Sequence, residues 1–214
     1  SPKLINKQPI ETILSNVIGT NSLLSLSVKN RIKSFLFFSS GEIYGNHNKI
    51  LTEDTTNNVN HLSDRTSYSE SKKMGEVLCH SYFKQKKIPI KIARLFHTYG
   101  PCMNLKDDRV MMDFVDKIIN NKNILIKGNG EQKRAFCYIS DAISGIFLIL
   151  INGQNGEAYN LGNSKQLFSI KKFANQLSKF NNKITVKVNG KFNKEKKNFR
   201  HDCYSPSIKK ISKL

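Results

Sequence analysis

The 214-residue sequence has no apolar run long enough to cross a bilayer. Its longest runs, at 35–38 and 146–151, are far shorter than the roughly 20 residues that a membrane helix needs. No cationic stretch followed by an apolar block marks the first residues as a secretion signal. We therefore expect a protein that acts in the cytoplasm and has no membrane partner.

The sequence also lacks cysteines at the spacing of a metal site. None of its cysteines belongs to a C-x-x-C pair; they stand at Cys79, Cys102, Cys137 and Cys203. In a chain of this size, isolated cysteines are typical of reduced, buried thiols in a cytosolic protein. We expect no metal and no disulfide framework.

Acidic residues are few: 16 stand against 35 basic ones, which gives a formal charge of +19. Such an excess can indicate nucleic-acid binding. Here, however, most of the basic residues are lysines spread along the chain beside asparagines. The densest run, at 191–197, has few aromatic side chains for stacking on bases and no arginine fork for phosphates. We expect no nucleic-acid partner and attribute the charge to a compositional bias.

What the sequence does contain is an alternation of helical and strand patterns. Helices are predicted at 10–29, 68–86, 109–121, 141–150 and 169–180, and strands at 35–38, 89–96, 124–127, 158–161 and 184–188. Asp141 is predicted to cap its helix. Alternation at this spacing favours a mostly parallel α/β sheet. Ligands of such sheets bind beyond the carboxyl ends of the strands, so chemistry is expected just after residues 38 and 96.

The most informative local pattern is Tyr68-Ser69-Glu70-Ser71-Lys72. Two residues four apart on a helix lie on the same face. An ammonium near a phenol favours the phenolate, so Tyr68 can act as a base toward a sugar hydroxyl while hydride leaves the same carbon. The alternative is an exposed lysine beside a half-buried tyrosine, because this spacing is common by chance.

Further motifs in a fixed order make the pattern specific. They are Pro9…Thr12…Asn16…Gly19-Thr20, Ser39-Ser40-Gly41-Glu42-Ile43-Tyr44-Gly45, Tyr68-x-x-x-Lys72, Ala93-Arg94-Leu95-Phe96-His97-Thr98-Tyr99-Gly100-Pro101, Gly128-Asn129-Gly130, Arg134-x-Phe136 and Asn160-Leu161-Gly162-Asn163. Together they resemble the extended short-chain dehydrogenases/reductases, the nucleotide-sugar epimerases, dehydratases and decarboxylases. Around Ser1-Pro2 and 107–110 the sequence is most similar to UDP-glucuronate decarboxylases.

The resemblance implies an NAD-dependent enzyme that oxidises C4 of a nucleotide-diphosphate sugar. Tyr68 would be the base, Lys72 would tune it and hold the nicotinamide ribose, and Ser40 would bind the 4-hydroxyl. Glu42 falls where a glutamate lies near sugar C5. Ser39 and Phe96 would lie at the cofactor. The implied substrate-binding residues are His97, Arg109, Arg134 and Arg200.

Several positions depart from the family pattern and leave the reaction open. Gly41 stands where dehydratases carry an acidic Asp and decarboxylases usually carry Ser. His97 replaces the usual Asn. Tyr204 precedes Ser205-Pro206 where decarboxylases place an arginine, a role that Arg200 would then have to fill. UDP-glucuronate decarboxylation is preferred; the alternatives are a 4-epimerase, a 4,6-dehydratase, a 4-reductase, or an inactive fragment that only binds a nucleotide sugar or a partner chain.

The sequence lacks the glycine-rich turn with which the family binds the NAD pyrophosphate. By the resemblance, roughly ninety residues with the first strands of the sheet are absent. The implied fold is the C-terminal portion of a doubly wound, Rossmann-like parallel sheet, with a small mixed α/β substrate-binding part. Residues 1–100 would belong to the dinucleotide-binding domain, and 101–214 mostly to the substrate-binding part, interleaved with the last strands of the sheet.

Two further expectations follow from this resemblance. The strand at 35–38 would lack a neighbour, so we expect the 214-residue chain by itself to bind NAD weakly and to associate through that edge. The family pairs through a four-helix bundle, so a homodimer is expected through helices 10–29 and 68–86.

Overall fold

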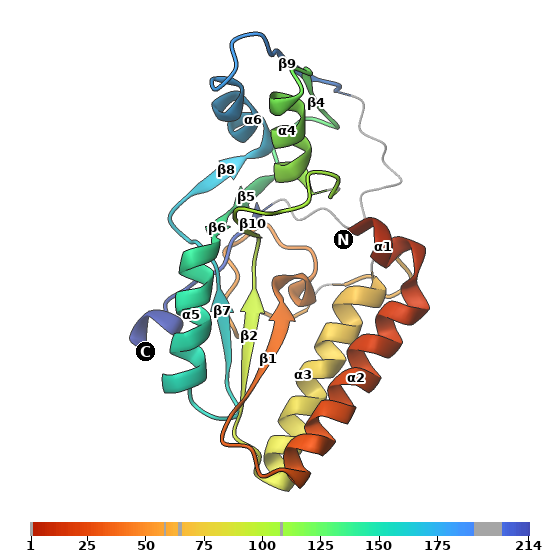
Figure 1. Cartoon of the computed structure of the whole chain (residues 1–214), viewed down its shortest axis with the longest axis vertical. Helices are drawn as coiled ribbons and strands as arrows, with labels where there is room; N and C mark the ends of the chain where they lie inside the picture. Colours follow the sequence, from red (N-terminus) through yellow and green to blue (C-terminus); the bar gives the residue numbers. More distant parts are fainter. Residues whose placement is uncertain (1, 58, 64–65, 108, 191–202) are drawn as a thin grey trace.

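The computed structural model describes residues 2–57, 59–63, 66–107, 109–190 and 203–214. At its centre lies a parallel sheet of β1 (Phe35–Ser40), β2 (Ile90–Leu95) and β7 (Ala158–Leu161), in the order β1-β2-β7. Helices α2 (Pro9–Lys29) and α3 (Thr66–Lys86) pack together along one side of this sheet, and α5 (Ile139–Asn152) covers the other (Figure 1).

Each face of the sheet has its own apolar core. Phe37 and Ile92 pair in register and pack with Leu24 and Cys79 toward the α2–α3 side. Residues one step along the strands, such as Ala93, pack toward α5 with the residues Ile149, Tyr159, Leu161 and Ile211. Because successive side chains of a strand point to opposite faces, a strand covered on both faces needs a continuous apolar run, as at 35–38.

A second group of elements lies at the end of the sheet toward which β1 and β2 point (Figure 1). Its apolar core joins α4 (Val110–Ile119), α6 (Ile170–Ser178), β4 (Ile124–Ile126) and β9 (Val186–Val188). Three more strands form a small mixed sheet in the order β10-β5-β8: β5 (Lys133–Ala135), β8 (Leu167–Ser169) and β10 (Cys203–Tyr204). The remaining elements are α1 (Pro2–Lys7), η1 (Gly41–Tyr44), β3 (Thr98–Tyr99), β6 (Cys137–Tyr138) and η3 (Ile211–Lys213).

The predicted parallel α/β sheet is confirmed, with element ends shifted by a few residues. Two details were wrong. Tyr138 rather than Asp141 is the N-cap of α5, because β6 leads directly into the helix and leaves Asp141 in its first turn. Cys102 is exposed, whereas the residues Cys79, Cys137 and Cys203 are buried as expected. The basic run at 191–197 lies outside the described residues.

Over the described ranges, no helix is both long and apolar enough to span a membrane. Within the same part of the chain, no group of three or more His, Cys, Asp or Glu residues is arranged to hold a metal ion.

Candidate active site

One face of α3 packs on β1 and carries both members of the Tyr–Lys pair. Tyr68, Lys72, Gly75 and Cys79 recur at three or four residues, so they share this face. A β-carbon at position 75 would lie 2.4 Å from Phe37 Cζ. Glycine therefore allows the helix to approach the strand closely, which brings Lys72 within reach of the β1 backbone.

Lys72 is the half-buried cation at the end of β1. Its Nζ donates a hydrogen bond to the Phe38 carbonyl at 3.0 Å and lies 5.3 Å from the centre of the Phe37 ring. Burial lowers the pKa of Lys72, because removal from water disfavours the charged form. An ammonium has three N–H donors, so the side chain has donors in addition to the one that Phe38 uses.

Ser40 ends β1 and caps η1. Its Oγ accepts a hydrogen bond from the Glu42 backbone N–H at 3.2 Å, and its hydroxyl also hydrogen bonds with Tyr204. The charges of Glu42 and Tyr68 both act on the Tyr204 phenol. Ser40, Glu42 and Tyr68, three of the four predicted catalytic residues, are thus gathered around Tyr204. Lys72 hydrogen bonds to the same end of β1, at the carbonyl of Phe38, two residues before Ser40.

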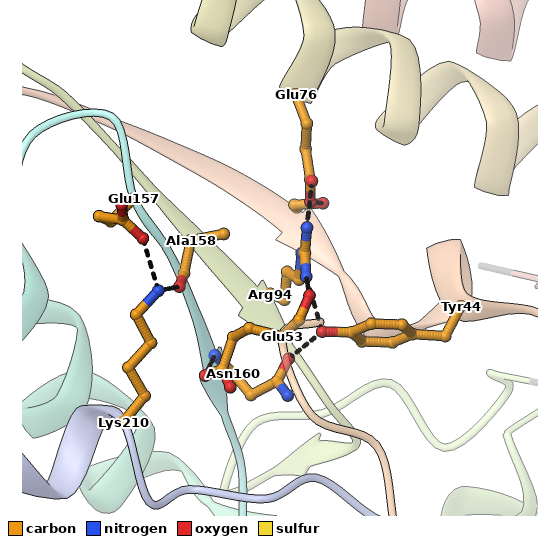
Figure 2. Close-up of polar contacts among 9 residues, drawn as sticks. Tyr44, Glu53, Glu76, Arg94, Glu157, Ala158, Asn160 and Lys210 are labelled. Atoms are coloured by element: carbon orange, nitrogen blue, oxygen red, sulfur yellow. Dashed lines mark hydrogen bonds and ion pairs between the residues drawn. The ribbon is translucent and has the colours of Figure 1, made fainter. Parts of the chain in front are cut away.

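Ser39 points into a neighbouring polar network rather than toward Lys72. Its hydroxyl donates to the Glu76 carboxylate, which also receives two hydrogen bonds from Arg94, at 3.0 and 2.8 Å. Arg94 further donates to Tyr44 Oη and to the Glu53 carbonyl (Figure 2). Burial alone would lower the pKa of the guanidinium, but the bonds and charge of Glu76 raise it overall.

The same network extends to the third strand of the sheet. The Tyr44 hydroxyl donates to Asn160 Oδ1 at 2.7 Å, and the Asn160 backbone N–H donates to Glu53 Oε1 at 2.8 Å (Figure 2). Burial raises the pKa of Tyr44 to about 12, partly offset by Arg94, so this phenol remains a neutral donor. The network ties the carboxyl ends of β1, β2 and β7 to α3.

Aromatic rings close the other side of the cluster. Phe96 is buried, and its ring centre lies 4.8 Å from that of Tyr204. The His97 ring lies 4.7 Å from Tyr204 and stacks on Phe136 at 5.8 Å. The Arg134 guanidinium lies 6.0 Å from the centre of the Tyr204 ring. Three residues predicted to bind cofactor or substrate (Phe96, His97 and Arg134) therefore meet at this tyrosine.

The other two predicted arginines are placed differently. Arg109 is the N-cap residue of α4, its side chain is half-exposed, and its Nε lies 3.4 Å from Asp107 Oδ2. Arg200 lies outside the described residues. In the sequence Tyr204 stands out only as a departure from the family pattern, and no motif assigns a role to Arg94 or Glu76. A buried charge pair could have been suspected from an arginine inside a strand that reads as buried.

A cavity of about 870 Å³ lies beside α3, on a different face of the helix. It is lined by Ser67, Glu70, Ser71 and Met74, together with residues of α2 and of the segment 61–63. The α3 residues among them recur every three or four positions, and they lie about a quarter-turn or more around the helix axis from Tyr68 and Lys72. The cavity therefore faces α2, whereas the Tyr–Lys pair faces the strand.

The residues present fit one end of a nicotinamide dinucleotide. A lysine with spare donors, a tyrosine one helical turn earlier and a serine at a strand end can bind ribose and sugar hydroxyls. Tyr68 and Lys72 are the residues that would hold the nicotinamide ribose.

A parallel α/β sheet with a Tyr–Lys helix packed on a strand that ends in serine defines a short-chain dehydrogenase/reductase. Residues 2–162 match the NAD dependent epimerase/dehydratase family, and the chain belongs to it. It is 34% identical over 175 residues to UDP-glucuronic acid decarboxylase 1 of Xenopus tropicalis, covering 81% of this chain and 41% of that protein. It is 37% identical over 166 residues to UDP-glucuronic acid decarboxylase 6 of Arabidopsis thaliana, covering 76% and 47%.

Solved structures show the same fold. A UDP-glucuronic acid 4-epimerase from Bacillus cereus, in complex with UDP-glucuronic acid and NAD, superposes with a TM-score of 0.80 at 28% identity, covering 94% of this chain and 61% of that one. A dTDP-glucose 4,6-dehydratase from Streptomyces venezuelae gives a TM-score of 0.83 at 20% identity, covering 100% and 63%. The chain thus spans less than half of the two decarboxylases and under two thirds of these two structures.

Proposed function

We propose that this chain is the catalytic portion of an enzyme that uses NAD to modify C4 of a nucleotide-diphosphate sugar, and that its reaction is UDP-glucuronate decarboxylation. The observation that carries the proposal is the placement of Tyr68 and Lys72 on the face of α3 that packs on β1, the strand that ends in Ser40. The similarity to two UDP-glucuronic acid decarboxylases, at 34% and 37% identity, supports the choice of reaction.

NAD, when bound, would supply the hydride acceptor for sugar C4 and the donor for its return, which gives access to a ketone at C4. Tyr68 accepts the proton of the 4-hydroxyl, and Ser40 hydrogen bonds with the same hydroxyl. The positive charge of Lys72 favours the ionised form of a phenol one helical turn away. The close approach of α3 to β1 at Gly75 holds these groups at one strand end.

A ketone at C4 makes the neighbouring C5 labile, because the carbonyl accepts the electrons released there. When C6 is a carboxylate, the C5–C6 bond breaks, carbon dioxide leaves, and C5 takes up a proton. We assign Glu42 to proton transfer at C5, because it lies two residues after Ser40 and its charge, like that of Tyr68, acts on the Tyr204 phenol. The product is then the five-carbon sugar nucleotide, UDP-xylose.

The second candidate is 4-epimerisation of the same substrate. It is favoured by Gly41 and Tyr204, which stand where decarboxylases usually carry Ser and Arg, and by the likeness to the UDP-glucuronic acid 4-epimerase. Epimerisation keeps the carboxylate and needs only return of the hydride to the opposite face of C4.

Incubation with UDP-glucuronate labelled at C6 separates the two reactions. The protein is made from the complete reading frame, supplied with NAD, and its products are separated by chromatography. Decarboxylation releases the label as carbon dioxide and gives UDP-xylose, which is the result we expect. Retention of the label in UDP-galacturonate would establish the epimerase instead. Tight binding of UDP-glucuronate without any product would favour the non-catalytic alternative.

We also propose that two copies of the protein pair through α2 and α3. Ile10, Leu14 and Ile18 form a stripe on α2 at four-residue spacing and are 67%, 49% and 56% exposed. We expect Leu14→Glu combined with Ile18→Glu to convert a dimer into a monomer in light scattering, since charges in an apolar interface are costly. Ile119→Glu, at an exposed apolar residue of α4, is the matched control. A dimer that survives the double substitution would refute this interface.

A further inference from the structure

Tyr204 is the buried centre of the candidate site, although it lies far from the other members in the sequence. It belongs to β10, which pairs with β5 beyond the end of the main sheet. The residue is 2% exposed. Its ring is held between Phe96 and His97, at 4.8 and 4.7 Å between ring centres, with Arg134 over it. So many ring contacts leave the hydroxyl with a fixed direction.

The hydroxyl of Tyr204 points at the end of β1. Burial, together with the charges of Glu42 and Tyr68, raises its pKa well above the ordinary value, and the hydrogen bond with Ser40 and the charge of Arg134 offset this only in part. Burial therefore favours the protonated phenol over the phenolate that a base would need. Its remaining role is to give or accept one hydrogen bond in a fixed place.

Gly41 leaves open the space that the Tyr204 phenol fills. A β-carbon at position 41 would lie 2.5 Å from Tyr204 Oη and 2.8 Å from Phe96 Cε1, closer than atoms pack. The phenol therefore occupies the volume that any side chain at position 41 would need. Gly41 and Tyr204 are therefore a size-matched pair: the first is small where the second is large.

We propose that Tyr204 is a positioning residue that orients the Ser40 hydroxyl for proton transfer. A serine hydroxyl has one proton to donate and two lone pairs to accept. The Glu42 amide already donates to Ser40 Oγ. Because burial favours the protonated form of the Tyr204 phenol, we assign Tyr204 as the donor in its hydrogen bond with Ser40, at the second lone pair. The proton of Ser40 is then left for the sugar hydroxyl and Tyr68. The expected effect of Tyr204 on kcat rests on the proposed function, whereas the contact between Tyr204 and Gly41 does not.

The kinetic test compares Tyr204→Phe and Ser40→Ala, alone and combined, in the protein made from the complete reading frame. We expect Tyr204→Phe to lower kcat about tenfold, with KM changed less than about twofold, because one neutral hydrogen bond to Ser40 is lost. In the Ser40→Ala background the same substitution should have no further effect on kcat, since residues that act as a unit are not additive. An equal tenfold loss in both backgrounds would overturn the proposal.

A second measurement does not depend on activity. We expect Gly41→Ala to lower the melting temperature by about 4 °C, because the added methyl group collides with the phenol oxygen. Combined with Tyr204→Phe, the loss should be smaller than the sum of the two single losses. Strictly additive losses in melting temperature would show that Gly41 and Tyr204 are not a size-matched pair. This outcome can be read even if the protein proves inactive on every nucleotide sugar. Tyr44→Phe, at another buried tyrosine, should be additive with Gly41→Ala.

Discussion

We expect replacement of Tyr68 by Phe to lower kcat on the nucleotide sugar by about 10²- to 10⁴-fold, the range that follows removal of a general acid–base. The ring remains and keeps its place on the face of α3 that packs on β1, so only the proton acceptor is lost. KM should change little, because binding of the diphosphate and nucleotide does not use this hydroxyl. Steady-state kinetics with UDP-glucuronate and NAD, at several pH values, measure the effect.

Tyr82→Phe is the matched control for this substitution. Tyr82 stands on the same helix, but its hydroxyl hydrogen bonds with Ser25 and Asn21 of α2. Its replacement should leave kcat within about twofold while costing about 1 kcal/mol of stability. If Tyr68→Phe retained more than a tenth of the activity, another group would be the base, and the assignment of the reaction to this site would fail.

The central elements of the fold could be predicted because their signals are local. The run at 35–38 is apolar on both faces of its strand, and the helix predicted at 68–86 agrees with α3 to within two residues. The two-residue strands β3, β6 and β10 gave no such signal, because each is defined by its partner rather than by its own residues. The prediction of Asp141 as the helix cap was wrong for a related reason, the lack of a local signal. Nothing local indicates that Tyr138, at the end of β6, already starts the helix.

The residues of the candidate site also differ in how far local sequence signals predict them. Ser40, Glu42, Tyr68 and Lys72 belong to two short motifs, and an ordered set of motifs can be recognised without a structure. Tyr204 joins them only through the pairing of β10 with β5, which a sequence does not reveal. One indirect signal existed: a glycine at position 41, where larger residues are usual, implies that another side chain fills the space. In the structure Tyr204, together with Phe96, fills that space.

The largest effect on stability is expected from Arg94→Ala. Arg94 and Glu76 are 14% and 11% exposed, and their side chains are joined by two hydrogen bonds. Removing one partner of a buried ion pair leaves the other uncompensated, which typically costs about 3–5 kcal/mol of unfolding free energy. Among the residues that the structure describes, Glu76 would then keep only the hydrogen bond from the Ser39 hydroxyl, and Tyr44 would lose its contact with the guanidinium. Denaturant unfolding of the two proteins measures the difference.

Lys117→Ala provides the comparison, because the Lys117–Asp113 pair on α4 is as short, at 2.7 Å, but its Asp113 side chain is 46% exposed. A helical pair of this kind contributes about 0.3–0.5 kcal/mol. Equal losses for the two substitutions would mean that the Arg94 network is no more than a surface contact. A large loss for Arg94→Ala alone has a further consequence. Ser39 is bound to Glu76 and is followed by Ser40, so loosening the network should also move the serine hydroxyl and lower kcat in the protein that remains folded.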